Sequence, residues 1–366
     1  MLLDAESGIN DSPRAAAYFA TTLQILERLG LKDDVADVSY WSSTFSYRML
    51  ASGEVVRVDT ARMQPPEAPY RYNAHFGQHI LGQIVSRHLL QKHDVRVRWN
   101  WRVVGLSQDD SSVTLSVETP HGQEHIQADW VVGTDGARSS VRHLLGLAFE
   151  GHTWPERFVA TNLYYDFDKY GFEPANMIAD PVNWAVVARL GRENMWRLTY
   201  AENAELDEAG ATSRIPQHYA AILPDPSAPY EIVASSPYRV HERCSPKFRL
   251  GRVLLAGDAA HACNPCGGMG LTGGVIDSDA LVKVLTAVIE GTASESVLDF
   301  YSTERRRVFL EVTSPIASRY KQRLHEQDAQ RRRADFEEFR QLAETPEQAL
   351  MATSLSKLLE GNPMPV

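Results

Sequence analysis

The 366-residue sequence predicts an α/β fold from three features of its pattern. Apolar runs of strand length twice end in glycine-containing turns that lead into helix-like segments, at residues 129–142 and again at 251–289. Between them, residues 150–243 show strand-like alternation and many aromatic side chains, which is typical of an antiparallel sheet. The chain beyond residue 296 is charged and rich in helix-forming residues. We therefore expect an α/β domain with an inserted antiparallel-sheet domain, followed by C-terminal helices.

The second of these turns has the chemistry expected of a flavin site. An apolar run ends in Gly257-Asp258, and a glycine-rich turn at 267–270 precedes a helix predicted over Val275 to Ile289. Glycine lets backbone N–H groups approach a ligand closely, and the helix dipole favours electron-rich groups at its N-terminus. The carboxylate of Asp258 is unsuited to bind an anion but can accept hydrogen bonds from a polyol. A flavin, with ribityl hydroxyls and an electron-poor ring, meets both conditions.

Both turn segments resemble motifs of one family. Residues 251–261 (GRVLLAGDAAH), continuing to GGMGL at 267–271, resemble the Gly-Asp motif of the flavoprotein aromatic hydroxylases, the class A flavoprotein monooxygenases typified by p-hydroxybenzoate hydroxylase. Residues 129–142 (DWVVGTDGARSSVR) resemble the same family's Asp-Gly motif, which lies near the FAD pyrophosphate and the approach of NAD(P)H. Two motifs in family order are a stronger signal than either alone. The resemblance implies a truncated Rossmann-like FAD-binding domain with an inserted antiparallel-sheet substrate domain and C-terminal helices.

The resemblance also implies a set of FAD-binding residues. Asp4 falls where an acidic residue binds the adenosine ribose, and Arg14 where an arginine packs along the flavin nucleotide. Gln78 begins a predicted helix. It is interpreted equally well as a residue that contacts FAD and as an ordinary solvated glutamine. Backbone N–H groups from Gly268 to Leu271 are placed to stabilise negative charge on the reduced ring. The full set is Asp4, Arg14, Gln78, Asp135, Gly136, Gly257, Asp258, Pro265, Gly267, Gly268, Gly270 and Leu271.

The family's opening strand and G-x-G-x-x-G turn have no counterpart in the sequence, which begins MLLDAE. This start resembles the end of the family's second strand, so about 30 residues of the nucleotide-binding unit are expected to be missing. Each lost charge-assisted hydrogen bond to the pyrophosphate would cost about 1.5–3 kcal/mol of binding free energy. Two alternatives to a competent monooxygenase therefore stand: a non-catalytic remnant that binds flavin poorly, and a flavoenzyme of the same fold with another reaction.

The same pattern predicts the domain organisation. Alternating runs near 95–99, 113–117 and 131–132 indicate a small antiparallel sheet, and the helix from residue 78 shows amphipathic spacing. The expected units are a first FAD-binding remnant (1–50), a substrate-domain loop and strand (51–75), an FAD-binding segment with the Asp-Gly motif (76–149), the antiparallel substrate domain (150–245), an FAD-binding segment with the Gly-Asp motif (246–295), and C-terminal helices with a tail (296–366).

Composition restricts the partners. A net charge of −10 argues against nucleic acid, because phosphate neutralisation needs clustered Lys and Arg. No apolar run reaches the length of a membrane span, and three cysteines fit a reducing, cytoplasmic location better than a disulfide framework. Cys263 and Cys266 form a C-x-x-C pattern, but tolerated positions within the flavin turn explain it better than a redox pair, because no thioredoxin-like context surrounds it. No residue set shows metal-ligand spacing.

The implied function is an FAD-dependent monooxygenase that uses NAD(P)H and O₂ to hydroxylate an aromatic or polyketide-like small molecule. In such an enzyme the cofactor supplies the difficult chemistry, which explains why no nucleophile–base pattern is evident. No catalytic residue is assigned; His75, His241 or a tyrosine would suit removal of a phenolic proton. Aromatic residues such as Trp154, Trp184 and Trp196 suit either a substrate pocket or a sheet core. The charged C-terminal helices offer a surface for a homodimer.

Overall fold

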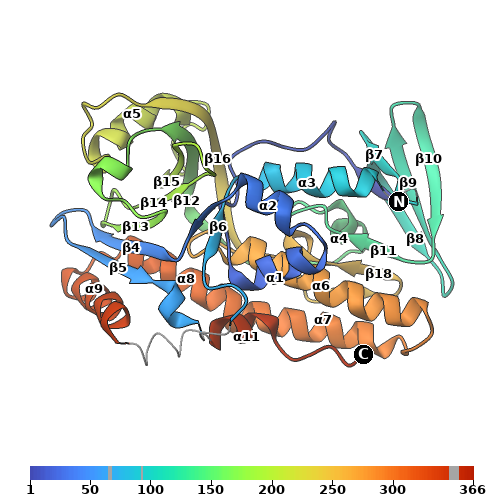
Figure 1. Cartoon of the computed structure of the whole chain (residues 1–366). Helices are drawn as coiled ribbons and strands as arrows, with labels where there is room; N and C mark the ends of the chain where they lie inside the picture. The colour runs from blue at the N-terminus through green and yellow to red at the C-terminus, as the bar shows by residue number, and fades with distance from the viewer. Residues whose placement is uncertain (65–67, 92–93, 346–353) are drawn as a thin grey trace.

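The computed structural model describes residues 1–64, 68–91, 94–345 and 354–366. Figure 1 shows two parts side by side, a large sheet with α5 and α9 at the left, and α3, α4 and both chain ends at the right. The α-helices are α1 (Ala20–Arg28), α2 (Lys32–Val38), α3 (Gln78–Leu90), α4 (Ser140–Leu144), α5 (Ala211–Ile222), α6 (Met269–Ile289), α7 (Ser296–Val308), α8 (Ser314–Leu324), α9 (Ala329–Glu344) and α11 (Ser354–Glu360). The short helical turns are η1 (Thr60–Met63), η2 (Asp168–Tyr170), η3 (Gly257–Ala259) and the π-type η4 (Phe309–Thr313).

The large sheet has eight strands in the order β19-β16-β12-β15-β14-β13-β4-β5. All neighbours are antiparallel except β13 and β4, which run parallel. Its strands are β4 (Thr44–Met49), β5 (Val55–Asp59), β12 (Glu150–Tyr164), β13 (Ala175–Ala179), β14 (Ala185–Arg189), β15 (Met195–Asn203), β16 (Glu231–Cys244) and β19 (His261–Ala262). The sheet thus begins at residue 44, inside the predicted range 1–50, and ends in a strand that directly follows the Gly-Asp turn.

The two faces of this sheet pack against different parts of the molecule, because side chains alternate along a strand. One face carries Leu163 and Leu198, which pack with Ile215 and Tyr219 of α5. The opposite face carries Phe158, which clusters with Trp184, Cys266 and Leu324. This second face therefore meets the glycine-rich turn that follows the Gly-Asp motif.

The second part of the molecule combines two parallel strand pairs with short antiparallel sheets, among them β10-β9-β8 and β2-β6-β3. Strand β11 pairs with β18, which brings the Asp-Gly and Gly-Asp motifs to neighbouring strands, and β1 pairs with β7. The runs near 95–99 and 131–132 therefore do not join an antiparallel sheet as predicted; their parallel partners lie far away in the sequence, where local alternation gives no signal. The strands here are β1 (Leu2–Asp4), β2 (Ala17–Tyr18), β3 (Tyr40–Ser42), β6 (Asn73–His75), β7 (Val97–Trp99), β8 (Arg102–Gln108), β9 (Val113–Thr119), β10 (Gly122–Ala128), β11 (Val131–Gly133), β17 (Arg249–Leu250) and β18 (Val253–Leu255).

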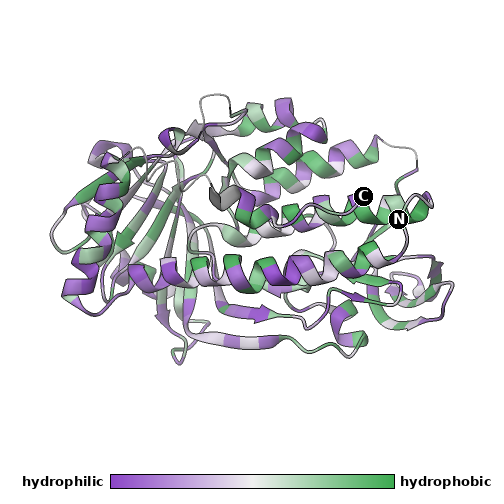
Figure 2. Cartoon of the chain, turned by 90° about the horizontal axis from the view of Figure 1, so that it is seen from below, coloured by the Kyte–Doolittle hydropathy of each residue, from purple (hydrophilic) through white to green (hydrophobic). Residues whose placement is uncertain are grey.

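Helix α6 begins earlier than its apolar pattern indicates. The sequence predicted a start at Val275, whereas the helix begins at Met269 after Gly268, whose φ of 69° is left-handed. Its first two turns contain Gly270, Gly273 and Gly274, which have low helix propensity and therefore hid the true start. Hydrophobic and hydrophilic residues alternate along the long helices (Figure 2), as expected for helices with one face in a core. None of the described helices is long and apolar enough to cross a membrane.

Candidate active site

The end of β18 lies directly against α6. Gly257 has a φ of 58°, a conformation that residues with a side chain rarely adopt. A Cβ atom added to Gly274 of α6 would lie 3.3 Å from the Gly257 Cα atom, so the two backbones touch. The Gly257 N–H group also donates a hydrogen bond to Asp277 Oδ2 at 3.1 Å. The strand end is therefore held in one position relative to the helix N-terminus.

Asp258 follows at the same turn and has an unusual environment. Solvent reaches its side chain, but protein atoms surround the carboxyl closely. This burial raises the pKa of the Asp258 carboxyl, and the charges of His261 and Arg14 lower the pKa by a smaller amount. Within the described residues no hydrogen-bond donor contacts this carboxylate. An acid that is accessible but enclosed, and that lacks a donor, is suited to accept hydrogen bonds from the hydroxyls of a bound ligand.

The turn before α6 accepts only glycine at two positions. A Cβ atom at Gly267 would lie 2.7 Å from the Tyr320 ring, and one at Gly268 would lie 3.0 Å from the Phe19 ring. The exposed Pro265 accepts a hydrogen bond from the Gly268 N–H group at 3.0 Å. No side chain caps α6, so its first-turn N–H groups, including those of Gly270, are free to face a ligand.

A buried ion-pair network lies behind this turn. Asp277 Oδ2 lies 2.6 Å from His261 Nε2, and Asp277 Oδ1 accepts a hydrogen bond from Arg305 Nε at 2.7 Å. Burial alone would raise the pKa of Asp277, but the charges of His261 and Arg305 outweigh it and lower this pKa to about 2. Arg305 Nη1 also donates to the carbonyl oxygens of Leu359 and Glu360, so the network ties α11 to the Gly-Asp turn.

Sequence reasoning missed Asp277 and Arg305, although a signal for them exists. Asp277 lies four residues after Gly273 and seven before Val284, on the buried stripe of α6. Arg305 lies four residues after Tyr301 on the buried stripe of α7. An acid and a base on apolar stripes of consecutive helices indicate an internal ion pair, because isolated buried charges are rarely tolerated.

The structure brings Arg14 and Gln78 into one local arrangement. Gln78 Oε1 accepts a hydrogen bond from the Ala15 N–H group at 3.2 Å, and the Gln78 N–H group donates to the Ala15 carbonyl at 3.1 Å. The side chain of Gln78 therefore fixes the backbone beside Arg14. Arg14 is exposed, and its charge lowers the pKa of Asp258, so it lies on the same side as the Gly-Asp turn.

The two remaining acids of the predicted set accept local hydrogen bonds. Asp4 ends β1, and its Oδ1 atom accepts from the Glu6 N–H group at 2.9 Å. Asp135 Oδ1 accepts from Ser139 Oγ at 2.5 Å, and its Oδ2 atom accepts from the Val141 N–H group at 3.1 Å. Asp135 thus stabilises the N-terminus of α4, and the following Gly136 makes the turn with a φ of 82°.

Arg142, which the sequence did not single out, connects the two motifs. Its guanidinium is buried and donates to the Ala137 carbonyl and to the Ala259 carbonyl, each at 2.8 Å. Ala137 belongs to the Asp-Gly segment, and Ala259 lies one residue after Asp258. The parallel pairing of β11 with β18 and this arginine therefore hold both motifs in one assembly.

The candidate bases and aromatic residues fall into different environments. Burial lowers the pKa of His75 to about 4, and both of its ring nitrogens lack a partner among the described residues. His241 Nδ1 lies 2.9 Å from Thr153 Oγ1. Trp196 packs in the core beneath α5, whereas Trp184 lies in the cluster that contains Cys266. Both tryptophans are buried in apolar clusters, as the sheet-core interpretation expects.

Both cysteines of the C-x-x-C pattern are free thiols. Burial raises the pKa of Cys266 to about 12 and that of Cys263 well above its usual range. Each thiol is therefore protonated at neutral pH, a state in which it is a poor nucleophile. No group of three or more His, Cys, Asp or Glu side chains in the described part of the chain is arranged to hold a metal ion.

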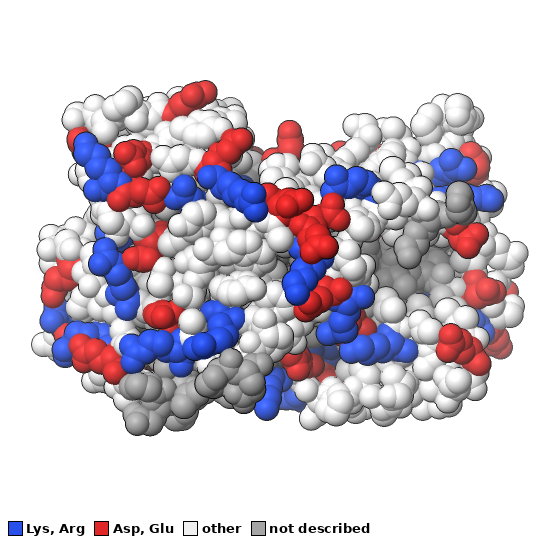
Figure 3. Space-filling view, in the orientation of Figure 1, with Lys and Arg blue, Asp and Glu red and all other residues white. Residues whose placement is uncertain are grey.

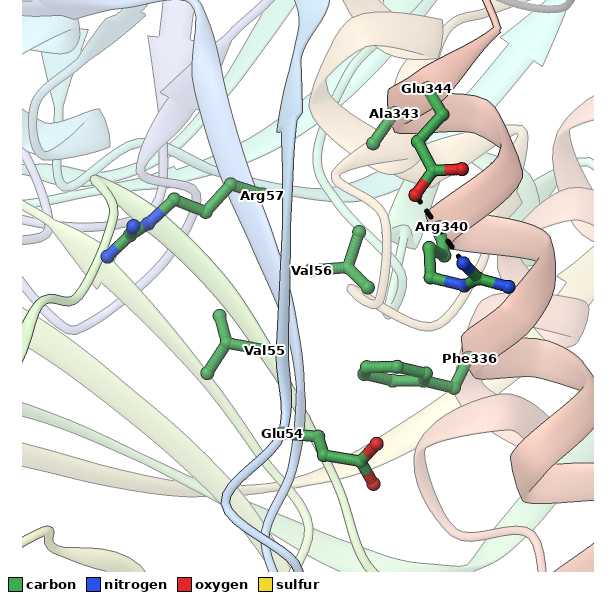
Figure 4. A pocket seen from close by; sticks show the side chains of 8 residues that line it. All are labelled: Glu54, Val55, Val56, Arg57, Phe336, Arg340, Ala343 and Glu344. Atoms are coloured by element: carbon green, nitrogen blue, oxygen red, sulfur yellow. Dashed lines mark ion pairs between the residues drawn. The ribbon is translucent and has the colours of Figure 1, made fainter.

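Two surface hollows lie apart from the predicted cofactor-binding residues. The larger, of about 390 Å³, lies between β5 and α9 and is lined by residues that include Arg57, Phe336 and Arg340 (Figure 4). The other is lined by residues that include Trp41 and Arg71. Acidic and basic side chains are intermixed over the face shown in Figure 3. None of the predicted cofactor-binding residues lines either hollow, so the site is identified by the Gly-Asp turn and its surroundings.

The chain belongs to a family of FAD-binding proteins. A family model described as an FAD binding domain matches residues 1–314. Para-nitrophenol 4-monooxygenase of Pseudomonas sp. (strain WBC-3) is 44% identical over 320 residues, which cover 87% of this chain and 79% of that protein. The 6-hydroxy-3-succinoylpyridine 3-monooxygenase of Pseudomonas putida (strain DSM 28022 / S16) is 40% identical and covers 87% and 81%, respectively.

Solved structures agree with this relationship. The crystal structure of p-nitrophenol 4-monooxygenase from Pseudomonas putida DLL-E4 matches with a TM-score of 0.94 and 41% identity, over 98% of this chain and 91% of that one. A ternary complex of aklavinone-11 hydroxylase with FAD and aklavinone matches with a TM-score of 0.77 and 26% identity, over 88% of this chain and 64% of that one. The predicted fold class, FAD cofactor and class of FAD-dependent aromatic monooxygenase are confirmed.

Proposed function

We propose that this chain uses NAD(P)H and O₂ to hydroxylate a small phenol, with FAD bound around the Gly-Asp turn. The enclosed, solvent-reachable carboxylate of Asp258 is the observation that carries this proposal, because it offers an acceptor to the ribityl hydroxyls. Gly257 and Gly267 keep the turn close to the helix. The N–H groups of Gly270 and Leu271 would face the electron-rich edge of the ring, since the Gly268 N–H group already donates to the Pro265 carbonyl.

The other candidate residues would hold the nucleotide half of FAD. Arg14 would neutralise part of the pyrophosphate charge, since its own charge already reaches the Asp258 turn. Asp4 would accept hydrogen bonds from the adenosine ribose at the end of β1. Asp135 and Gly136 would act indirectly, because their contacts fix the start of α4 beside the Gly-Asp turn. Pro265 restricts the turn that leads to the flavin.

FAD, when bound, supplies the hydride and oxygen chemistry, and the chain supplies position, polarity and exclusion of water. The first turn of α6 would stabilise negative charge on the ring through free N–H groups and the helix dipole. The sheet face that carries Phe158 and Trp184, together with Cys266, forms an apolar wall beside the glycine turn. A flat aromatic substrate would lie between this wall and the flavin.

We infer that the substrate is a phenol with an electron-withdrawing group opposite the hydroxyl. The names of the relatives support this inference, since one acts on para-nitrophenol and another on a hydroxylated pyridine. Insertion of oxygen at the carbon that carries a nitro group would release that group as nitrite, with loss of the phenolic proton, and leave a quinone. A polyketide-like substrate is the second candidate, favoured by the similarity to aklavinone-11 hydroxylase.

The test is turnover by the FAD-supplemented chain with 4-nitrophenol. We expect substrate-dependent oxidation of NADH or NADPH, consumption of O₂ and release of nitrite. Asp258→Asn keeps the size of the side chain but weakens hydrogen bonding to the ribityl chain, so FAD should dissociate about 10–100 times more readily. Asp279→Asn, which lies on α6 and pairs with Arg28 and Lys283, is the matched control. NAD(P)H oxidation that never depends on any phenol would contradict the proposal.

We also propose a cytoplasmic location and a homodimer. The three cysteines are free thiols, which fits a reducing compartment. The charged outer faces of α7 and α9 supply the surface proposed for the homodimer. Cell fractionation and light scattering at several protein concentrations test these two proposals separately.

A further inference from the structure

A buried arginine on the large sheet has no charged partner. Arg197 of β15 is only 5% exposed, and its Nη1 atom has no hydrogen-bond partner. Its Nε and Nη2 atoms both donate to Asn162 Oδ1, at 3.0 and 2.8 Å. No carboxylate in the described ranges pairs with this guanidinium, and burial lowers its pKa only to about 10, so it remains charged at neutral pH. A buried charge without a counter-charge is costly unless a ligand supplies one.

A second orphaned donor lies near Arg197. Tyr18 of β2 is fully buried, and its hydroxyl also has no partner among the described residues. The charge of Arg197 lowers the pKa of Tyr18 against the larger effect of burial, so the two side chains lie within electrostatic reach of each other. Tyr18 stacks on Phe76 with ring centroids 4.0 Å apart, which fixes its ring. Two donors from separate sheets thus lack an acceptor in the same region.

The strand register places Arg197 on the sheet face that meets the flavin turn. Arg197 lies opposite Asn162 in the pairing of β15 with β12. Side chains two residues apart share a face, so Asn162 lies on the face of Phe158, which clusters with Cys266. Between these positions lies the short side chain of Ala160, opposite Thr199. The polar pair of Asn162 and Arg197 thus lies about 13 Å along the strand from Phe158, and the residues between them on this face are small.

The other titratable groups around Arg197 are basic or neutral. Tyr238 of β16 and His79 of α3 both respond to its charge, and burial raises the pKa of Tyr238 and lowers that of His79. Arg14 acts on Tyr238 as well, which places this group beside the proposed flavin site. Asp11 opposes this charge at His79, but the groups that act on Arg197 itself are the two tyrosines, Tyr238 and Tyr18.

We propose that Arg197 and Tyr18 bind the phenolate oxygen of the aromatic substrate. This inference rests on the proposed function and identifies the ionised form of the substrate at that site. A bound phenolate supplies the missing counter-charge and accepts the free N–H of Arg197 and the O–H of Tyr18. Phenolate also has a more electron-rich ring than phenol, which favours attack by an electrophilic oxygen. Arg197 is thus a specificity-determining residue that selects hydroxylated rings.

The test uses the FAD-loaded, oxidised protein without NAD(P)H, titrated with 4-nitrophenol and with nitrobenzene. Binding is followed by difference absorption, which also reports the pKa of the bound phenol. We expect Arg197→Gln to weaken binding of 4-nitrophenol about 10–100-fold and to raise the pKa of the bound phenol. Binding of nitrobenzene should change less than about twofold, and Tyr18→Phe should have a smaller effect of the same sign. Arg197→Lys, which keeps the charge, should recover part of the affinity.

Arg239→Gln, an exposed arginine on β16, is the control and should bind both probes as the parent chain does. Equal loss for both probes would assign Arg197 to the nitro group or to general packing and overturn the proposal. Loss of FAD from Arg197→Gln, with unchanged affinity for 4-nitrophenol once FAD is restored, would assign the guanidinium to the flavin and also overturn it. A parent chain that binds neither probe would contradict phenolate recognition. Tight 4-nitrophenol binding without NAD(P)H oxidation would count against the proposed function alone.

Discussion

Two buried arginines differ in what neutralises them. Arg305, 2% exposed, pairs with Asp277 behind the Gly-Asp turn, and Arg197, 5% exposed, has no carboxylate among the described residues. The first arrangement completes its own charge balance and holds the flavin turn against α6. The second is complete only when a ligand brings an acceptor. The difference separates a part of the molecule that supports the site from a part that recognises what enters it.

The largest expected effect comes from breaking the self-contained network. Asp277→Asn leaves Arg305 buried without a counter-charge, so the free energy of unfolding should fall by about 3–5 kcal/mol. Urea denaturation measures this change. Asp279→Asn, two residues further along α6 with partly exposed partners, should cost less than about 1 kcal/mol. Equal costs for the two variants would contradict the supporting role of Asp277.

The glycine turn should be nearly as sensitive. Gly267→Ala places a Cβ atom 2.7 Å from the Tyr320 ring and demands a left-handed backbone from alanine. We expect a loss of about 2–4 kcal/mol from the two effects together, and weaker retention of FAD. Gly291→Ala has a similar φ of 72° but open space around it, so it reports the backbone cost alone, about 1–2 kcal/mol. Thermal unfolding and FAD titration of both variants separate the two contributions.

Acid should weaken the ion pairs of Asp277 with His261 and Arg305, whereas the buried Arg197 has no carboxylate partner to lose among the described residues. The pKa of Asp277 is lowered from 3.8 to about 2 in the folded chain. A lowered folded-state pKa contributes stability above the unfolded-state value and loses it as the pH falls, so about 2 kcal/mol should disappear between roughly pH 4 and pH 2. Urea unfolding at a series of pH values measures this loss. In Asp277→Asn this component of the pH dependence should be absent, and an unchanged slope would contradict the assignment.

The smallest effect on stability is expected at Arg197. Arg197→Met removes an unpaired buried charge but also two hydrogen bonds to Asn162, so the two changes should offset to within about 1 kcal/mol. Arg305→Met, the same substitution in the paired network, should cost about 3–5 kcal/mol. Comparable destabilisation in both variants, measured by urea unfolding, would show that Arg197 is a structural residue.

Sequence reasoning succeeded where structure is local. The two strand–turn–helix motifs, the helix from Gln78 and the glycines of the turn are written in contiguous residues. It failed where partners lie far apart. The parallel partners of β7 and β11, the contact of Arg142 with Ala259, and the pairing of Arg197 with Asn162 depend on which strands become neighbours. Local patterns do not specify that choice.

Helix starts and buried charges form an intermediate case. The start of α6 was missed because three glycines in its first two turns have low helix propensity, whereas close packing against the Gly-Asp turn requires one of them, Gly274. Asp277 was not singled out from the sequence. Helical spacing alone would have placed it on the buried stripe with Gly273 and Val284.

The visible absorption spectrum of the purified chain tests the central claim most directly. The protein is measured before and after addition of excess FAD, followed by gel filtration to remove unbound cofactor. We expect flavin bands that elute with the protein at about one FAD per chain, because Asp258, Arg14 and the first turn of α6 are already assembled. A colourless protein that never retains FAD would contradict the assignment of these residues to a flavin site.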